Sequence, residues 1–240
     1  MNKILFILGS PRKKGTGYYL AKELKNQIYN HIGKEKETII DEFYLSDTSY
    51  EYCRGCMNCF INGECELSKI DSYDFDKRLE QYQGIVIFVP TYIHQMPGKL
   101  KNCFDRMAFR FHEFPLIGKK VVIITYTASN GGDTLVDYTK GMFTMLGAEV
   151  VDSILVYEIE ESFDLAINRM VVSVVEMIKR IKNNTFQIRS SQEKSFKYLK
   201  SVVQTEKEEK IATFKQKRWS EMMGYNSLKE YVEEKFILRN

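Results

Sequence analysis

The sequence of 240 residues predicts an α/β protein built on an open, doubly wound parallel sheet. Two observations carry this prediction. Short apolar runs recur through the first three-quarters of the chain, and segments with the spacing of an amphipathic helix lie between them. Strands and helices that alternate in this way form right-handed crossovers, which place helices on both faces of a parallel sheet.

Five strands and five helices are predicted in the first part of the chain. The strands are residues 4–8, 85–89, 121–125 and 150–157, with 38–45 as a weaker candidate. The clearest helix is 100–111, where apolar residues recur at i, i+3, i+4 and i+7. The other helices cover about 18–30, 73–82, 133–146 and 164–181.

Strand signals stop after residue 184, so residues 1–184 are predicted to form the α/β domain and 185–240 a helical C-terminal extension. Ser190 with Glu193, and Ser227 with Glu230, each match a capping box that opens a helix. Gly224 is placed to end the helix that carries Trp219. Residues 179–218 hold 12 Lys or Arg against four Glu. They could bind a polyanion, but a solvated helical face is the favoured interpretation.

The composition is that of an ordinary soluble protein, with 44% hydrophobic and 28% charged residues and a net charge of +3. This balance requires neither nucleic acid nor a membrane as a partner. The apolar run 4–8 is too short for a signal peptide, and no stretch approaches the ~20 apolar residues of a membrane span. We therefore expect a cytoplasmic protein, in which clustered cysteines indicate metal or redox chemistry.

A candidate anion site follows the first predicted strand, in the segment LGSPRKKGTG. It brings hydroxyls and cations to the start of a helix, where free N–H groups and the helix dipole favour an anion. The segment matches neither a Walker loop nor the GxGxxG fingerprint. Alone it fits an ordinary basic turn as well as a phosphate site.

Two further loops are predicted to join this one. FVPTYIHQMPG follows the third strand and TYTASNGGDT follows the fourth, and ligands of open α/β sheets bind at the carboxyl ends of strands. A phosphate site at one end and an aromatic, glycine-rich site at the other indicate a mononucleotide with an extended planar ring.

Four of the five cysteines lie in CRGCMNCFINGEC, as Cys53, Cys56, Cys59 and Cys65. A structural zinc site usually draws ligands from two separated knuckles, whereas one compact run suits an iron-sulfur cubane. The final gap of five residues, followed by Glu66, differs from the ferredoxin pattern. A reduced, metal-free loop is an equal alternative, and a cycling disulfide is less favoured. The fifth, Cys103, occupies the apolar stripe of its helix and is predicted to be buried.

Four segments in the same order carry a resemblance to a known family: GSPRKKGTGYYLA, CRGCMNCFINGEC, VPTYIHQMPGKLKNCFDRM and FHEFPLIGKKVVIITYTASNGGD. They resemble the flavodoxin-like NAD(P)H-dependent FMN reductases, and most closely their iron-sulfur flavoprotein branch. The resemblance covers about residues 1–160. It implies a flavodoxin-like fold with strand order 2-1-3-4-5, FMN at the strand carboxyl ends, and a homodimer or homotetramer with the flavin near a subunit interface.

The resemblance also implies roles for individual residues. The phosphate would be bound by Ser10, Arg12 and Thr16, with the backbone of Lys14 and Gly15 beside them. The isoalloxazine would be framed by Pro90, Thr91, Tyr92, Ile93 and Met96 on one side and by Ala128, Ser129, Gly131 and Gly132 on the other. This chain departs from the family at Thr16-Gly17, where relatives often have Asn or Ser followed by Thr, so one hydroxyl ligand of the phosphate is missing.

The function implied is an FMN-dependent oxidoreductase that passes electrons from NAD(P)H to a small acceptor such as a flavin, quinone or nitro compound. The flavin supplies the chemistry, so no catalytic side chain is expected. The alternative is an electron-transfer protein with FMN and a 4Fe-4S cluster, held by the four cysteines and reduced by a ferredoxin-like partner. A flavin-sensing regulator that binds a polyanion through the basic extension is the weakest alternative.

Overall fold

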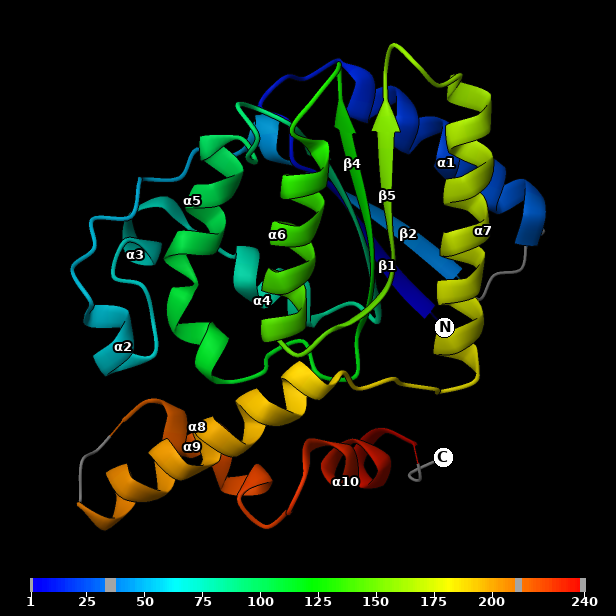
Figure 1. The fold of residues 1–240 in the computed structure, drawn as a ribbon. Helices are drawn as coiled ribbons and strands as arrows, with labels where there is room; N and C mark the ends of the chain where they lie inside the picture. The colour runs from blue at the N-terminus through cyan, green and yellow to red at the C-terminus, as the bar shows by residue number, and fades with distance from the viewer. Residues whose placement is uncertain (1, 33–37, 210–212, 238–240) are drawn as a thin grey trace.

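Five parallel strands form one sheet in the order β2-β1-β3-β4-β5, seen in the computed structural model of this chain, which describes residues 2–32, 38–209 and 213–237 (Figure 1). The strands are β1 Asn2–Leu8, β2 Thr38–Tyr44, β3 Gly84–Pro90, β4 Lys120–Thr127 and β5 Glu149–Tyr157. Every residue of the central strands β3 and β4 is buried, which explains the apolar runs 85–89 and 121–124 within them. The five predicted strands and the predicted flavodoxin-like order are confirmed.

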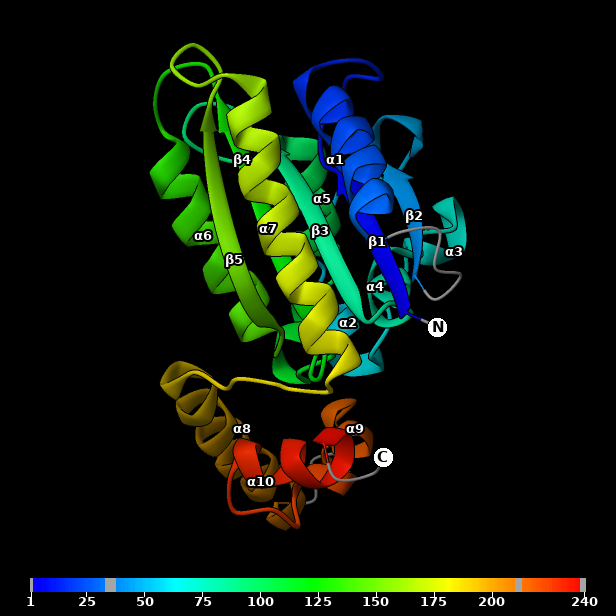
Figure 2. The same cartoon turned by 90° about the vertical axis from the view of Figure 1, so that its right-hand side faces the viewer.

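Helices cover both faces of the sheet (Figure 2). On one face lie α1 Thr16–Ile32 and α7 Phe163–Lys182, packed on Ile4, Phe6 and their neighbours. On the other lie α4 Phe75–Glu80, α5 Gly98–Arg106 and α6 Gly132–Met145. Alternate residues of each strand therefore enter two separate cores.

Two predicted helices are shorter than expected. The predicted helix 100–111 divides into α5 and a 3-10 helix, η2 Ala108–His112, and the segment 73–82 forms only α4. The chain between β2 and β3 begins with a 3-10 turn, η1 Leu45–Asp47, and carries two short helices, α2 Asn58–Asn62 and α3 Ser68–Asp71. The four clustered cysteines lie in this connection.

The C-terminal extension folds beneath the amino ends of the strands, at the opposite end of the sheet from their carboxyl ends (Figure 1). It consists of α8 Ser190–Glu208, α9 Lys215–Met222, α10 Leu228–Val232 and a π-helical turn, η3 Glu233–Ile237. Its core joins Phe196, Trp219 and Leu228 to Phe114 and Ile117 of the α/β part. The indole N–H of Trp219 donates to the His112 carbonyl at 2.9 Å. We propose that the boundary between the α/β domain and the C-terminal extension lies after residue 184.

One of the two predicted capping boxes is wrong. Helix α8 begins at Ser190 itself, so Arg189 is the N-cap and the Gln192 side chain accepts from its N–H at 2.9 Å. Glu193 instead accepts from the N–H groups of Leu228 and Lys229, because α10 packs against α8. The prediction for Ser227 holds, since its hydroxyl accepts from the Glu230 N–H at 3.1 Å.

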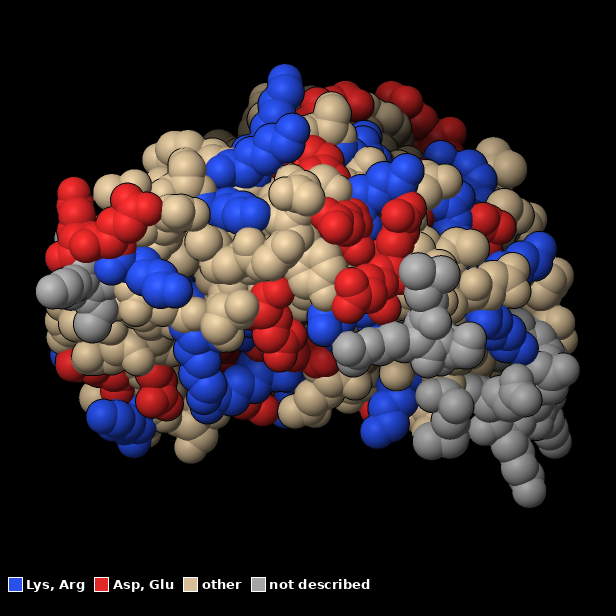
Figure 3. All heavy atoms as spheres, turned by 90° about the horizontal axis from the view of Figure 1, so that it is seen from below, with Lys and Arg blue, Asp and Glu red and all other residues tan. Residues whose placement is uncertain are grey.

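The basic residues of the extension are mixed with acidic ones on the folded surface. Figure 3 shows Lys and Arg interspersed with Asp and Glu over the face seen from below. Lys215 pairs with Glu206 at 2.5 Å, while Lys210 lies outside the described residues. This arrangement favours a solvated helical face. None of the helices in the described ranges is long and apolar enough to cross a bilayer.

Candidate active site and cysteine loop

A pocket of about 220 Å³ opens where β1, β3 and β4 reach their carboxyl ends. Its lining combines hydroxyls, backbone, one guanidinium and one carboxylate: Ser10, Arg12, Gly15, Thr16, Pro90, Thr91, Tyr92, Tyr126, Thr127, Ala128 and Glu158. All of these except Tyr126, Thr127 and Glu158 were predicted from the sequence. Three loops that are distant in the sequence therefore meet in one pocket.

The predicted anion end of this pocket lies between β1 and α1. The strand ends at Leu8 and the helix begins at Thr16, so the predicted loop spans the intervening residues. The Ser10 hydroxyl accepts from the Arg12 N–H at 3.1 Å, which fixes the turn. Arg12 and Lys14 are exposed beside the amino end of the helix, although Lys14 does not line the pocket. Cations and a helix amino end together favour a phosphate.

The second end of the pocket is bordered by a tight turn after β3. Tyr92 and Gln95 exchange two backbone hydrogen bonds at 2.7 and 3.1 Å, and the two residues between them are left-handed, Ile93 at φ 48° and His94 at φ 61°. A β-branched residue rarely adopts this conformation, and such strain concentrates at functional sites. The turn leaves the Ile93 side chain 97% exposed, whereas Met96 is buried in the core.

The loop after β4 packs directly on this turn. Gly131 has a φ of 76°, and a Cβ placed on it would lie 2.7 Å from the His94 ring. Gly132 opens α6, where a Cβ would lie 2.3 Å from Leu155, and Ser129 is exposed. The two loops predicted to frame a ring are therefore in contact, although Ile93, Met96, Ser129, Gly131 and Gly132 do not line the pocket.

Two polar side chains show that the pocket fits a polar ligand. The Thr91 hydroxyl is buried with no hydrogen-bond partner among the described residues, which is unusual for a buried polar atom. The Tyr126 hydroxyl is also inside. Burial, followed by the nearby Tyr92 and Glu158, raises its pKa, so it stays protonated at neutral pH.

The sequence carried a weak signal for the three residues that were missed. Tyr126 and Thr127 close β4, and Tyr126 was interpreted only as part of the loop segment TYTASNGGDT. Glu158 directly follows β5, and none of the three loops predicted to form the site follows that strand. The rule that ligands bind at strand carboxyl ends covers all three.

A second pocket, of about 480 Å³, is lined by all four clustered cysteines. Cys53 and Cys56 are exposed, Cys59 and Cys65 are partly buried, and all four are free thiols. Within the described ranges, no three His, Cys, Asp or Glu side chains converge on a point that would suit a single metal ion. The thiols border a shared space instead. Burial, with the charges of Cys65 and Cys53, raises the pKa of Cys59.

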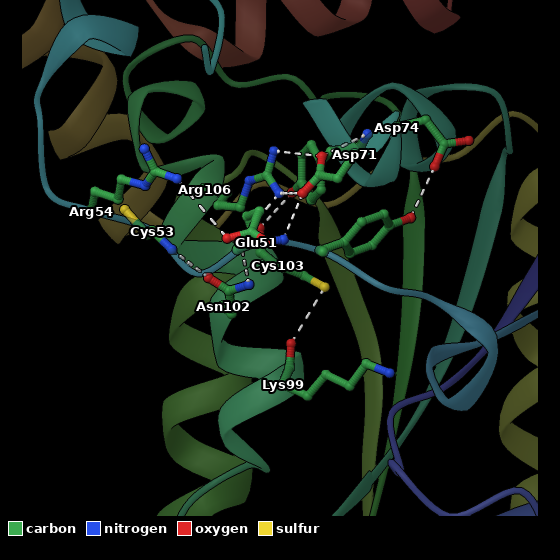
Figure 4. Close-up of polar contacts among 11 residues, drawn as sticks. Glu51, Cys53, Arg54, Asp71, Asp74, Lys99, Asn102, Cys103 and Arg106 are labelled. Atoms are coloured by element: carbon green, nitrogen blue, oxygen red, sulfur yellow. Dashed lines mark hydrogen bonds and ion pairs between the residues drawn. The ribbon is translucent and has the colours of Figure 1, made fainter. Parts of the chain in front are cut away.

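Helix α5 holds the start and end of this cysteine loop, residues 48–73 (Figure 4). The Asn102 amide accepts from the Cys53 N–H at 2.8 Å and donates to the Glu51 carbonyl at 3.0 Å. Arg106 donates to the same carbonyl at 3.2 Å and forms an ion pair with Asp71. Asp71 also accepts from the Glu51 N–H at 2.6 Å. The helix therefore fixes both ends of the segment that presents the thiols.

Of two predictions about the side chains of α5, the structure confirms one in full and the other only in part. Its Cys103 is buried as expected, and burial raises the pKa of this thiol to about 12, so it is unreactive at neutral pH. The spacing of the apolar residues in the sequence predicts that Asp105 and Arg106 lie on the polar face of this helix, as an ion pair or as interface contacts. Asp105 is indeed on that face and pairs with Lys101, but Arg106 is 1% exposed because the cysteine loop covers it.

Comparison with known proteins shows which family this chain resembles in sequence. The family description for NADPH-dependent FMN reductase matches residues 2–160. An iron-sulfur flavoprotein of Archaeoglobus fulgidus is 31% identical in an alignment of 161 residues that covers 63% of this chain and 74% of that protein. A second iron-sulfur flavoprotein, from Clostridioides difficile, is 29% identical and covers 63% of this chain and 65% of its own length.

Solved structures are similar in fold. An FMN-dependent NADH-azoreductase from Bacillus anthracis, determined in complex with FMN, superposes with a TM-score of 0.56 over 74% of this chain and 99% of its own. Its sequence is 18% identical, so this similarity concerns the fold alone. The fold, the family match and the curated relatives agree that this chain belongs to the NADPH-dependent FMN reductase family, in its iron-sulfur flavoprotein branch.

Proposed function

We propose that this chain is an FMN-dependent oxidoreductase that passes electrons from NAD(P)H to a small acceptor such as a flavin, a quinone or a nitro compound. The family assigns FMN as the cofactor and a nicotinamide as the donor. The observation that carries the proposal is the pocket at the strand carboxyl ends, with an anion site at one end and two packed loops at the other. When bound, FMN supplies the hydride and electron transfer.

Different residues of the pocket would bind different parts of FMN. Ser10, Arg12, Gly15 and Thr16 would bind the phosphate through hydroxyl, guanidinium and backbone groups, with Lys14 adding positive charge nearby. The ribityl chain and the ring would be bordered by Pro90, Thr91, Tyr92 and Ala128. The Thr91 hydroxyl, which has no partner among the described residues, would then form a hydrogen bond with the flavin. The chain therefore needs to orient the flavin but not to provide an acid or a base.

The second part of the ring site depends on the packed loops. Ile93 and Met96, with Ser129, Gly131 and Gly132, remain proposed ring neighbours, because the two loops that carry them are in contact. The exposed Ile93 also supports a homodimer or homotetramer in which a neighbouring subunit covers the ring end. Light scattering of the purified protein would detect a monomer, which would contradict this assembly.

The enzyme proposal is tested by anaerobic reduction. The FMN-loaded chain is mixed with a stoichiometric amount of NADH or NADPH, and the visible absorbance of the flavin is followed. Rapid bleaching, followed by recovery on addition of a quinone, is the expected result. Bleaching by a reduced ferredoxin but by neither nicotinamide would contradict the proposal and favour the electron-transfer alternative.

The cysteine pocket favours a second candidate function, an electron-transfer iron-sulfur flavoprotein. A 4Fe-4S cluster takes one thiolate from each of four cysteines, and here four reduced thiols of one segment border one pocket. Arg54 and Arg106 line the same pocket and would offset the negative charge of the thiolates. Cys53, Cys56, Cys59 and Cys65 would therefore hold the cluster.

Iron analysis separates the cluster from a metal-free loop. The protein is purified without exposure to air, and iron and sulfide are measured per chain. We expect about four of each, a loss of both in Cys56→Ser, and retention in Cys103→Ala, which changes a thiol outside the pocket. Iron and sulfide near zero in the unexposed wild-type protein would leave the segment as a loop without metal.

A further inference from the structure

Tyr126 occupies the anion end of the pocket although no sequence pattern assigned it a role. It is the penultimate residue of β4 and only 5% exposed, and it shares the pocket lining with Ser10, Arg12 and Thr16. Its hydroxyl oxygen lies beside Gly17, the second residue of α1, at 2.3 Å from the position that a Cβ would take there. The hydroxyl therefore lies at the amino end of α1, where the phosphate is expected.

The ring of Tyr126 also explains why residue 17 is glycine. A Cβ on Gly17 would lie 2.3 Å from the Tyr126 hydroxyl oxygen, 2.9 Å from its Cζ and 3.1 Å from a ring carbon. Atoms this close cannot coexist without movement. The φ of Gly17 lies outside the left-handed region that favours glycine, so the space taken by Tyr126, not the backbone, requires glycine here. Gly17 and Tyr126 are a matched pair.

We infer that Tyr126 is a phosphate-binding residue, whose hydroxyl donates to the FMN phosphate and replaces the hydroxyl that residue 17 lacks. The inference rests on FMN as the ligand of this pocket. A neutral tyrosine has one hydroxyl hydrogen to donate, and a hydrogen bond to a charged acceptor is stronger than one between neutral groups. The hydroxyl therefore discriminates FMN from riboflavin, which is the same molecule without the phosphate.

The first experiment compares the two ligands on Tyr126→Phe. Dissociation constants for FMN and riboflavin are measured by quenching of flavin fluorescence. We expect the affinity for FMN to fall about tenfold or more, with riboflavin unchanged within about twofold. Tyr157→Phe is the control, because its hydroxyl binds Asp133 outside the pocket lining. Equal weakening of both ligands, or an unchanged FMN affinity, would overturn the role of Tyr126.

The second experiment tests the pair by substituting Gly17 alone and together with Tyr126. Gly17→Thr alone should lose FMN affinity, because the new Cβ meets the tyrosine. Gly17→Thr combined with Tyr126→Val removes the obstacle and should bind FMN more tightly than Tyr126→Val alone, with thermal unfolding measured in parallel. Full FMN affinity in Gly17→Thr would contradict the matched pair. Wild-type protein that binds no FMN would instead refute the proposed function, so the two failures are distinguishable.

Discussion

Arg106 and Asp71 form a buried ion pair that fastens the end of the cysteine loop to helix α5. The guanidinium side chain is 0% exposed and the carboxylate 7%. Two hydrogen bonds join them, one of them 3.1 Å long. The Arg106 Nε has no hydrogen-bond partner among the described residues. The burial of the guanidinium is offset by this pair, by the Glu51 carbonyl, and by the rings of Tyr73 and Tyr50, whose centroids lie 4.3 and 5.9 Å from its Cζ.

Asp71→Asn is expected to destabilise the protein and release the loop. The substitution leaves a buried cation without its counter-charge, which costs about 3–5 kcal/mol of unfolding free energy. The cysteines should then react faster with a thiol reagent under native conditions. Asp105→Asn is the matched control, because its partner Lys101 is partly exposed and the pair contributes about 1 kcal/mol or less. Equal effects in urea unfolding would contradict this account.

The same pair predicts a loss of stability in acid. Burial raises the pKa of Asp71, but hydrogen bonds from Arg106 and the Glu51 N–H outweigh it and leave the pKa below its usual value. A lowered carboxyl pKa contributes stability above the unfolded pKa of about 4, and this stability is lost as the pH falls through the folded pKa. Asp71→Asn should therefore flatten the acid limb of a plot of unfolding free energy against pH; an unaltered slope would argue against the pair.

Lys119 predicts that stability also rises with pH in the basic range. Its ammonium donates to the Tyr82 carbonyl at 2.9 Å, and burial, with the nearby Arg218, lowers its pKa to about 8. Between that value and the unfolded pKa of about 10.4, the unfolded state binds more protons, so stability rises with pH. We expect a gain of about 1–2 kcal/mol from pH 8 to about 9.5. Urea unfolding of Lys119→Met should lack this gain, and a slope equal to that of the wild type would contradict the assignment.

Gly131→Ala should disturb the ring end of the pocket. The new Cβ would meet the His94 ring at 2.7 Å, and φ 76° costs a non-glycine residue about 1–2 kcal/mol. The turn at Ile93 must move, so FMN affinity should fall with the stability. Gly141→Ala lies in the same helix with no atom within 4 Å of the new Cβ, and it should leave FMN binding unchanged. Unchanged fluorescence titrations in both variants would show that the loop contact does not shape the site.

Glu158→Gln should tighten FMN binding. This half-buried carboxylate lines the pocket that receives the phosphate, and two like charges repel more strongly where water is excluded. Removing the charge should improve the FMN dissociation constant about threefold to tenfold at low salt, less at high salt, with riboflavin unaffected. The exposed Glu160→Gln serves as the control. Weaker FMN binding in Glu158→Gln would mean that the carboxylate accepts a hydrogen bond from the ligand.

Sequence patterns predicted the sheet well because its strands are buried on both faces. The fully buried β3 and β4 contain the apolar runs 85–89 and 121–124, and the strand order followed from the family resemblance. Patterns failed where a tertiary contact outweighs a local preference. Glu193 caps α10 instead of its own helix, and Arg106 is buried by a loop about 50 residues earlier in the chain.

The site residues, like the elements of the fold, were predicted where a local pattern marks them and missed where a tertiary contact decides. Residues of the loops after β1, β3 and β4 were predicted, since the carboxyl ends of strands mark the crevice. Tyr126 was not, because a tyrosine at the end of an apolar strand is indistinguishable from a core residue until its distance to Gly17 is known. The departure at Gly17 was visible in the sequence, but its compensation depends on a residue more than 100 positions away.

The most direct test of the central claim is a fluorescence titration of the flavin-free wild-type protein with FMN and with riboflavin. We expect saturation at one FMN per chain, a much weaker riboflavin complex, and loss of this preference in Arg12→Met, which removes the guanidinium from the anion end. Equal affinity for the two flavins, or an FMN affinity that is the same in Arg12→Met, would contradict a phosphate site between β1 and α1.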